Sequence, residues 1–225
     1  MTHVTDDLAA AIVAARLTPD ESQVVFRRLL DALARPGRMA WLPADVARRV
    51  PPALVPALAL CDLEVTCCVV ARADQHVDWA EVVATATGAR RVGLAESAWV
   101  AALDRLSGDD IAQLRRGTAL APEQGARLVH ACRQLHVGEG NQPWSSTDHD
   151  EAVVTIELTG PGIPGRRRIS ITGVDPEVFD ALAAANQAFP AGVDTWLVAD
   201  SGALIGLPRT TRIAVLARTQ HTGGH

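Results

Sequence analysis

The sequence predicts an α/β fold in which a mixed sheet, part parallel and part antiparallel, is covered by helices. Helical and strand patterns alternate along most of the chain, as they do where helices join parallel strands. In the last third, short strand patterns follow one another at hairpin spacing. The chain has 225 residues, a length that suits one domain, so we expect a single domain over 1–225.

The clearest helix is predicted over residues 18–35. Thr18 suits the N-cap, Pro19 the first helical position, and Glu21 completes a capping box. Apolar residues then recur at helical spacing until Pro36 and Gly37 end the helix. Similar patterns predict an N-terminal helix within 1–17 and further helices at 54–60, 81–86, 109–115 and 175–188.

The strands are predicted from runs of β-branched and apolar residues. They lie at 39–42, 64–71, 128–132, 153–158, 168–171, 194–198, 203–207 and 212–217, while residues 99–103 fit either a strand or a helix. Residues 136–150 are polar, contain glycine and lack periodicity, which predicts a surface loop. We expect residues 220–225 to form a frayed tail.

Composition excludes several classes of function. All 21 basic residues are arginine, so no lysine can form a Schiff base or hold a phosphate in a P-loop. A net charge of −5 makes nucleic-acid binding a poor expectation. No apolar run is long enough for a membrane span, and the first residues do not resemble a secretory signal, so we expect a cytoplasmic protein.

The motifs that usually mark cofactor or metal sites give no site here. Residues 160–165 (GPGIPG) match a dinucleotide-binding fingerprint, but a strand pattern follows where a helix is required, so we predict a tight turn. The four cysteines lack C-x-x-C spacing and are interpreted as buried thiols, with Cys67 and Cys68 on opposite faces of a strand. No catalytic residue, metal ligand or cofactor-binding residue is assigned.

One short segment carries a candidate binding site. Arg209, Thr210, Thr211 and Arg212 place two guanidinium groups and two hydroxyls together, a set that can hold a phosphate-like anion. Ion pairing with a carboxylate at a subunit interface is the alternative, since arginine carries no special phosphate signal in a chain without lysine. Arg27, on the helix at 18–35, is a similar candidate, for which simple exposure is the alternative.

Taken in order, several segments resemble the PhnH family, which belongs to the bacterial carbon–phosphorus lyase system. The resemblance covers about 22–215. Its motifs are FRRLLDALARPGR at 26–38, GTALAPEQGA at 117–126, LTGPGI at 158–163, FPAGVD at 189–194 and IGLPRTT at 205–211.

The resemblance implies a component of phosphonate degradation, which acts with the G, I and L subunits in ATP-dependent formation of ribose 1-alkylphosphonate 5-triphosphate. It implies a complex with the G, I and J subunits, and a homodimer when isolated. The family's fold is similar to that of pyridoxal-phosphate-dependent transferases but has no cofactor site. The family supplies no catalytic residues, so we expect a docking or structural subunit of a transferase complex. The alternative is a subunit that binds phosphonate or triphosphate through its Arg and Thr side chains.

Overall fold

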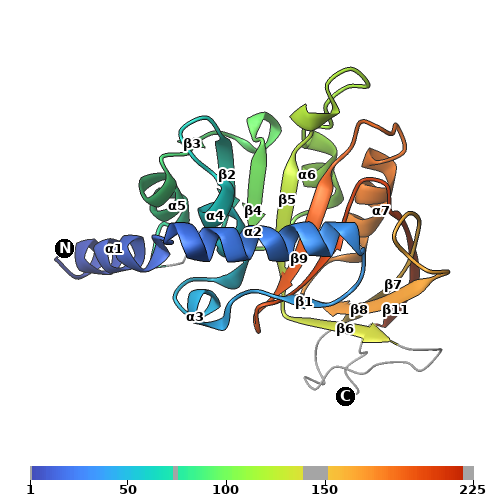
Figure 1. Ribbon diagram of the computed structural model, residues 1–225, viewed down its shortest axis with the longest axis horizontal. Coiled ribbons are helices and arrows are strands. Elements are labelled where there is room, and N and C mark those ends of the chain that lie inside the picture. Colours follow the sequence, from blue (N-terminus) through green and yellow to red (C-terminus); the bar gives the residue numbers. More distant parts are fainter. Residues whose placement is uncertain (1, 73–75, 139–151, 220–225) are drawn as a thin grey trace, which may run out of the picture.

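A computed structural model describes residues 2–72, 76–138 and 152–219. A mixed sheet of seven strands lies at its centre, as Figure 1 shows. The strand order is β1-β10-β9-β5-β4-β2-β3. Strands β3, β2, β4, β5 and β9 run parallel, and the edge pair β10 and β1 continues the sheet antiparallel. The bounds are β1 Ala40–Trp41, β2 Thr66–Val70, β3 Arg90–Arg91, β4 Trp99–Ala102, β5 Arg127–Cys132, β9 Asp194–Ala199 and β10 Ala203–Leu207. The predicted α/β class with a mixed sheet is confirmed.

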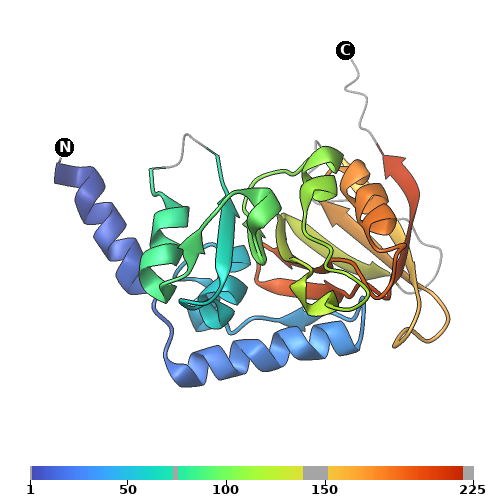
Figure 2. The same ribbon diagram turned by 90° about the horizontal axis from the view of Figure 1, so that it is seen from above.

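Helices pack on both faces of this sheet (Figure 2). One face is covered by α2 (Pro19–Ala34), α4 (Val55–Leu60) and α5 (Trp79–Thr87), and the other by α6 (Gly108–Gln113) and α7 (Pro176–Ala185). Two further helices are α1 (Thr2–Ala15), which contacts α5, and α3 (Ala44–Ala47). Short 3₁₀ turns lie at Pro52–Leu54, Leu94–Glu96 and Pro122–Gln124. None of the helices in the described ranges is long and apolar enough to cross a lipid bilayer.

A second, four-stranded antiparallel sheet packs beside α7, whereas the sequence predicts one sheet. Its order is β11-β7-β8-β6, with bounds β6 Gln134–Gly138, β7 Val153–Thr159, β8 Arg167–Thr172 and β11 Arg212–Thr219. The surface loop predicted at 136–150 is therefore wrong at its start, because pairing with β8 makes a strand of a polar sequence. The remaining loop residues 139–150 and the tail 220–225 lie outside the described residues.

The central sheet divides the core into two clusters. In β4 all four residues are buried: Trp99 and Ala101 join the cluster under α2, α4 and α5, and Val100 and Ala102 join the cluster under α7 and the second sheet. A strand buried on both faces has no alternation, which explains why residues 99–103 fit either structure at the sequence level. The edge strand β3 carries only two exposed arginines and is missed by the sequence analysis for lack of any apolar signal.

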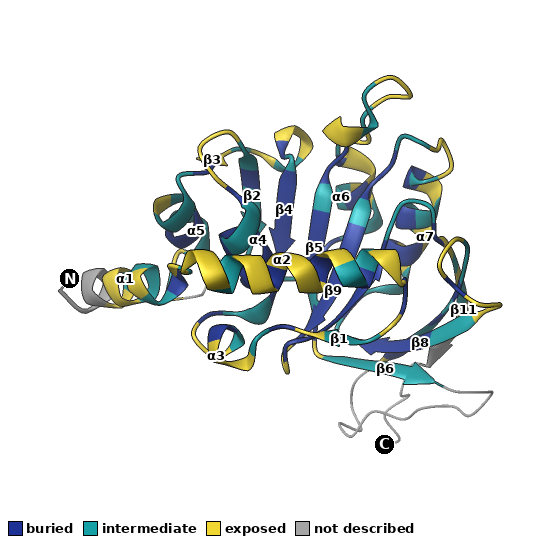
Figure 3. Ribbon diagram, viewed as in Figure 1, coloured by how far each residue is buried: buried dark blue, intermediate teal, exposed yellow. Residues whose placement is uncertain are grey.

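Helix α2 lies directly on the sheet, with its opposite face exposed (Figure 3). Its Thr18 capping box is present as predicted. At Gly206 of β10, an added Cβ would lie 2.5 Å from the carbonyl oxygen of Ala32, so only glycine permits this approach. The indole of Trp196 donates to the carbonyl of Leu29 at 3.1 Å, which fixes the helix on the sheet.

Candidate functional site

A cleft of about 800 Å³ opens between α7, the turn after β7 and the start of β11. Its lining contains two arginines, three threonines, two amides and a group of apolar side chains, without any Asp or Glu among the described residues. The lining residues are Thr159, Gly160, Pro161, Ala183, Asn186, Gln187, Phe189, Arg209, Thr210, Thr211, Arg212 and Ile213. Four of the five residues that the sequence analysis selects therefore line one cleft.

Arg209 is held by groups of its own chain. Its Nε and Nη2 donate to the carboxylate of Asp194, the latter at 2.7 Å, and its backbone N–H donates to the same carboxylate at 2.9 Å. Its Nη1 donates to the carbonyl oxygens of Pro122 at 2.6 Å and Pro190 at 3.2 Å. The side chains are 12% exposed for Arg209 and 22% for Asp194. Arg209, Asp194 and the two carbonyls, which we call the Arg209 network, join three separate segments.

Glycines let these segments approach one another closely. Gly192 donates its N–H to the carbonyl of Arg116 at 2.7 Å, and the Cβ of any larger residue at Gly125 would collide with the carbonyl oxygen of Gly192. Asn186 at the end of α7 receives the Val193 N–H at 2.7 Å and donates to the Val193 carbonyl. The motifs at 117–126, 189–194 and 205–211 thus meet around Arg209.

The other two motifs, at 26–38 and 158–163, meet at the turn after β7. The predicted turn is confirmed: β7 and β8 form an antiparallel hairpin, and within its connection the Ile163 N–H donates to the carbonyl of Gly160 at 3.2 Å, which closes a tight turn over 160–163. Within that turn, a Cβ added at Gly162 would lie 2.9 Å from the carbonyl oxygen of Ala34, at the end of α2. The dinucleotide fingerprint therefore reflects a turn that packs against a helix end.

The remaining candidates have different surroundings. Thr211 is buried, and its hydroxyl finds no hydrogen-bond partner within the described ranges. Thr210 is half-buried and Arg212 is exposed, so both are accessible in the cleft. Arg27 is exposed on α2, which packs on the other face of the central sheet, and it does not line the cleft.

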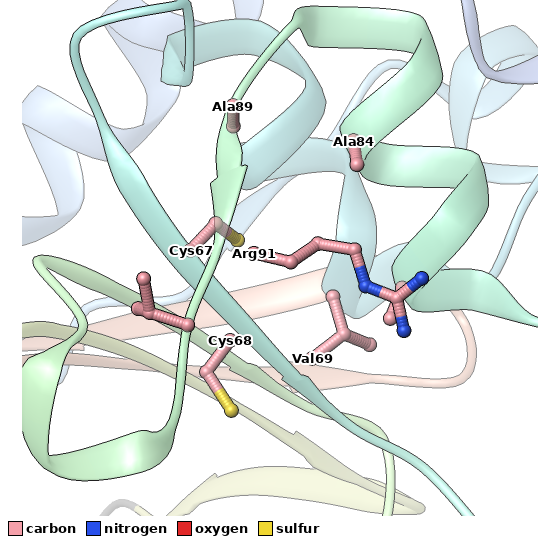
Figure 4. Close-up of a pocket in the computed structure, with 8 residues that line it drawn as sticks. Cys67, Cys68, Val69, Ala84, Ala89 and Arg91 are labelled. Atoms are coloured by element: carbon pink, nitrogen blue, oxygen red, sulfur yellow. The ribbon is translucent and has the colours of Figure 1, made fainter.

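A smaller pocket of about 100 Å³ lies at β2 and α5 and is lined by Cys67, Cys68 and Arg91 among others (Figure 4). Cys67 and Cys68 belong to different core clusters, which confirms that they lie on opposite faces of the strand. A hydrogen bond between Cys61 and Cys67 raises the pKa of the Cys61 thiol and lowers that of Cys67. Across the ranges that the structure describes, no group of three or more His, Cys, Asp or Glu side chains is placed to bind a metal ion.

His130 is a titratable side chain buried within the central sheet. It lies on β5, and its Nδ1 is 2.6 Å from the carbonyl oxygen of Ala131. Burial lowers its pKa below the ordinary value of 6.5. The neutral imidazole is therefore a core group, and it does not line the cleft.

Asp194, the carboxylate partner of Arg209, is not predicted as a site residue. The register of the β9–β10 hairpin would identify it, because β9 and β10 pair Leu207 with Thr195 and so bring residue 194 opposite residue 208. Phe189, which is 63% exposed and lines the cleft, is not predicted either. An exposed aromatic side chain in a loop has no periodic pattern that would mark it.

Comparison with known proteins places these motifs in a family. Residues 15–214 match the model of the bacterial phosphonate metabolism protein PhnH. A protein of Stutzerimonas stutzeri, provisionally named as the C-P lyase subunit protein HtxG, is 32% identical over 195 residues, which cover 85% of each chain. The alpha-D-ribose 1-methylphosphonate 5-triphosphate synthase subunit PhnH of Rhizobium meliloti (strain 1021) is 33% identical over 203 residues, covering 86% of this chain and 90% of that protein. The chain belongs to the PhnH family of bacterial phosphonate metabolism proteins.

Proposed function

We propose that the chain is a subunit of the complex that forms ribose 1-methylphosphonate 5-triphosphate, and that it acts there by docking to other subunits. The observation that carries this proposal is the match to PhnH over 15–214, together with a relative named as a subunit of that synthase. The expected partners are the G, I and J subunits, and the isolated chain is proposed to be a homodimer.

The Arg209 network supports a structural role for the family's motifs. The donors of Arg209 are engaged by Asp194 and by two backbone carbonyls of the same chain. Ion pairs of this kind fix the relative positions of loops. The motifs therefore determine the shape of the surface that a partner would meet.

Exposed apolar side chains on α2 and β1 support docking. Phe26 and Leu30, one turn apart on α2, are 47% and 55% exposed, and Trp41 on the edge strand β1 is 55% exposed. Exposed aromatic and aliphatic side chains often mark protein contacts. Helix α2 contacts β1, and we propose Phe26, Leu30 and Trp41 as contacts for a partner subunit of the complex.

We also propose that the fold is related to that of pyridoxal-phosphate-dependent transferases. A mixed sheet with helices on both faces is consistent with it. The chain has no lysine to bind that cofactor as a Schiff base, so we propose a related fold that works without the cofactor.

The test is a pull-down of the tagged chain from phosphate-starved cells of its own host, with captured proteins identified by mass spectrometry. Recovery of the other synthase subunits in fixed ratio is expected. Replacing both Phe26 and Leu30 by Ser should reduce that recovery, whereas Leu216→Ser, an equally polar change at a 46% exposed position on β11, should not. Recovery of the tagged chain alone, from cells shown to contain the partners, would overturn the proposal.

A further inference from the structure

We propose that the cleft beside the Arg209 network binds the phosphorus oxyanion of a sugar phosphate or sugar phosphonate, with Arg212 and Thr210 holding the oxyanion and Phe189 packing on the sugar. This inference rests on the proposed function, because it assigns one of the complex's ligands to this chain.

Charge favours an anion in this cleft. The protein carries 26 acidic residues and a net charge of −5, yet the cleft is lined by two arginines and, among the residues described, by no acid. Asp194 pairs with Arg209 and offsets its charge. Arg212 is exposed, so its guanidinium can form the paired hydrogen bonds that phosphate and phosphonate oxygens accept.

The size of the cleft and its apolar lining favour an anion that carries an organic group. A volume of about 800 Å³ lies within the range of pockets that hold small organic ligands and far exceeds one phosphate group. Pro161, Ala183, Phe189 and Ile213 supply apolar surface. The amide of Gln187 can bond a sugar hydroxyl, whereas the amide of Asn186 is engaged by Val193. The exposed ring of Phe189 offers a flat surface to a sugar ring.

Arg209 serves this site as a positioning residue. Its hydrogen bonds to Asp194 and Pro122 hold the segment that carries Thr210 and Arg212 against the rest of the fold. Removing Arg209 would disturb the whole region, so the variants that test binding are placed at exposed residues.

The experiment is calorimetric titration of the full chain with ribose 5-phosphate, inorganic phosphate, methylphosphonate and, for comparison, sulfate. We expect saturable binding of ribose 5-phosphate and weaker binding of the others. Arg212→Ala should weaken it about tenfold, the effect of losing one charge-assisted contact. Arg27→Ala, which removes the same charge from α2 outside the cleft, should bind like the wild type.

The Phe189→Ala variant tests the contact with the sugar independently of the contact with the anion. It should weaken ribose 5-phosphate binding and leave inorganic phosphate binding unchanged. If methylphosphonate binds the wild type but not Arg212→Ala, the phosphonate end of the ligand lies at Arg212. If the wild type binds ribose 5-phosphate but not methylphosphonate, the 5-phosphate end lies there. Wild-type levels of binding in Arg212→Ala, an equal loss in Arg27→Ala, or binding of sulfate as tight as that of ribose 5-phosphate would overturn the inference.

The same variants distinguish this inference from the proposed function. Arg212→Ala is expected to capture the partner subunits like the wild type while binding ribose 5-phosphate about tenfold more weakly. If the wild type binds ribose 5-phosphate but captures no partner, the subunit assignment fails and the cleft assignment stands. If the wild type captures its partners but binds none of the four anions, the cleft assignment fails and the subunit assignment stands.

Discussion

Replacing Arg209 by Ala should destabilise the fold by about 3 to 4 kcal/mol, because several bonds of a largely buried network disappear together. The guanidinium makes charge-assisted hydrogen bonds to the carbonyls of Pro122 and Pro190, each of which contributes about 1.5 kcal/mol. The variant also leaves the Asp194 carboxylate, 22% exposed, without its counter-charge. Partial contact of that carboxylate with water keeps the destabilisation in the lower half of the range for buried pairs.

The assay is urea unfolding followed by tryptophan fluorescence, since Trp99 and Trp196 are both buried in the central sheet. Arg105→Ala is the matched control, because Arg105 pairs with Asp175 at 2.9 Å with side chains 62% and 38% exposed. Exposed pairs contribute less than about 1 kcal/mol. A loss in Arg209→Ala no larger than in Arg105→Ala would refute the argument that the Arg209 network holds the three segments together.

Three further predictions concern the rest of the fold. Gly206→Ala should cost about 2 kcal/mol of unfolding free energy, because its Cβ would lie 2.5 Å from the carbonyl oxygen of Ala32, whereas Gly93→Ala, with open space around it, should be nearly neutral. Burial lowers the pKa of His130, so stability should fall as the pH drops below the ordinary 6.5, and His130→Leu should flatten that part of the curve of unfolding free energy against pH. Thr18→Ala removes the N-cap of α2 and should cost about 1 kcal/mol in urea unfolding; an unchanged midpoint would contradict the capping role.

Local signals account for most of the elements. The α2 helix follows from its capping box and apolar spacing, and the β7–β8 turn follows from the strand pattern after Gly165. Residues 134–138 form a strand only because β8 lies beside them, which no local pattern shows. The division into two sheets likewise depends on which strands pair, and that is a property of the assembled chain.

The candidate site shows the same limit. The sequence places Arg209, Thr210, Thr211 and Arg212 together because they are neighbours in the chain. It does not show that Asp194 accepts hydrogen bonds from Arg209, since that contact depends on the β9–β10 register and on the approach of two loops. Exposure then separates Arg212, which is available to a ligand, from Arg209, which is engaged.

The strand order also determines when each strand can find its partner during synthesis of the chain. Arg127 of β5 pairs with Asp194 of β9, far along the chain, and β1 near the N-terminus pairs with β10 near the C-terminus. Until the ribosome has released residues 194–207, the half-made sheet keeps an open edge along β5, and β1 has no neighbour. Nascent chains with such an edge are prone to join other strands. The unfinished sheet therefore stays open to such pairing until nearly the whole chain has emerged.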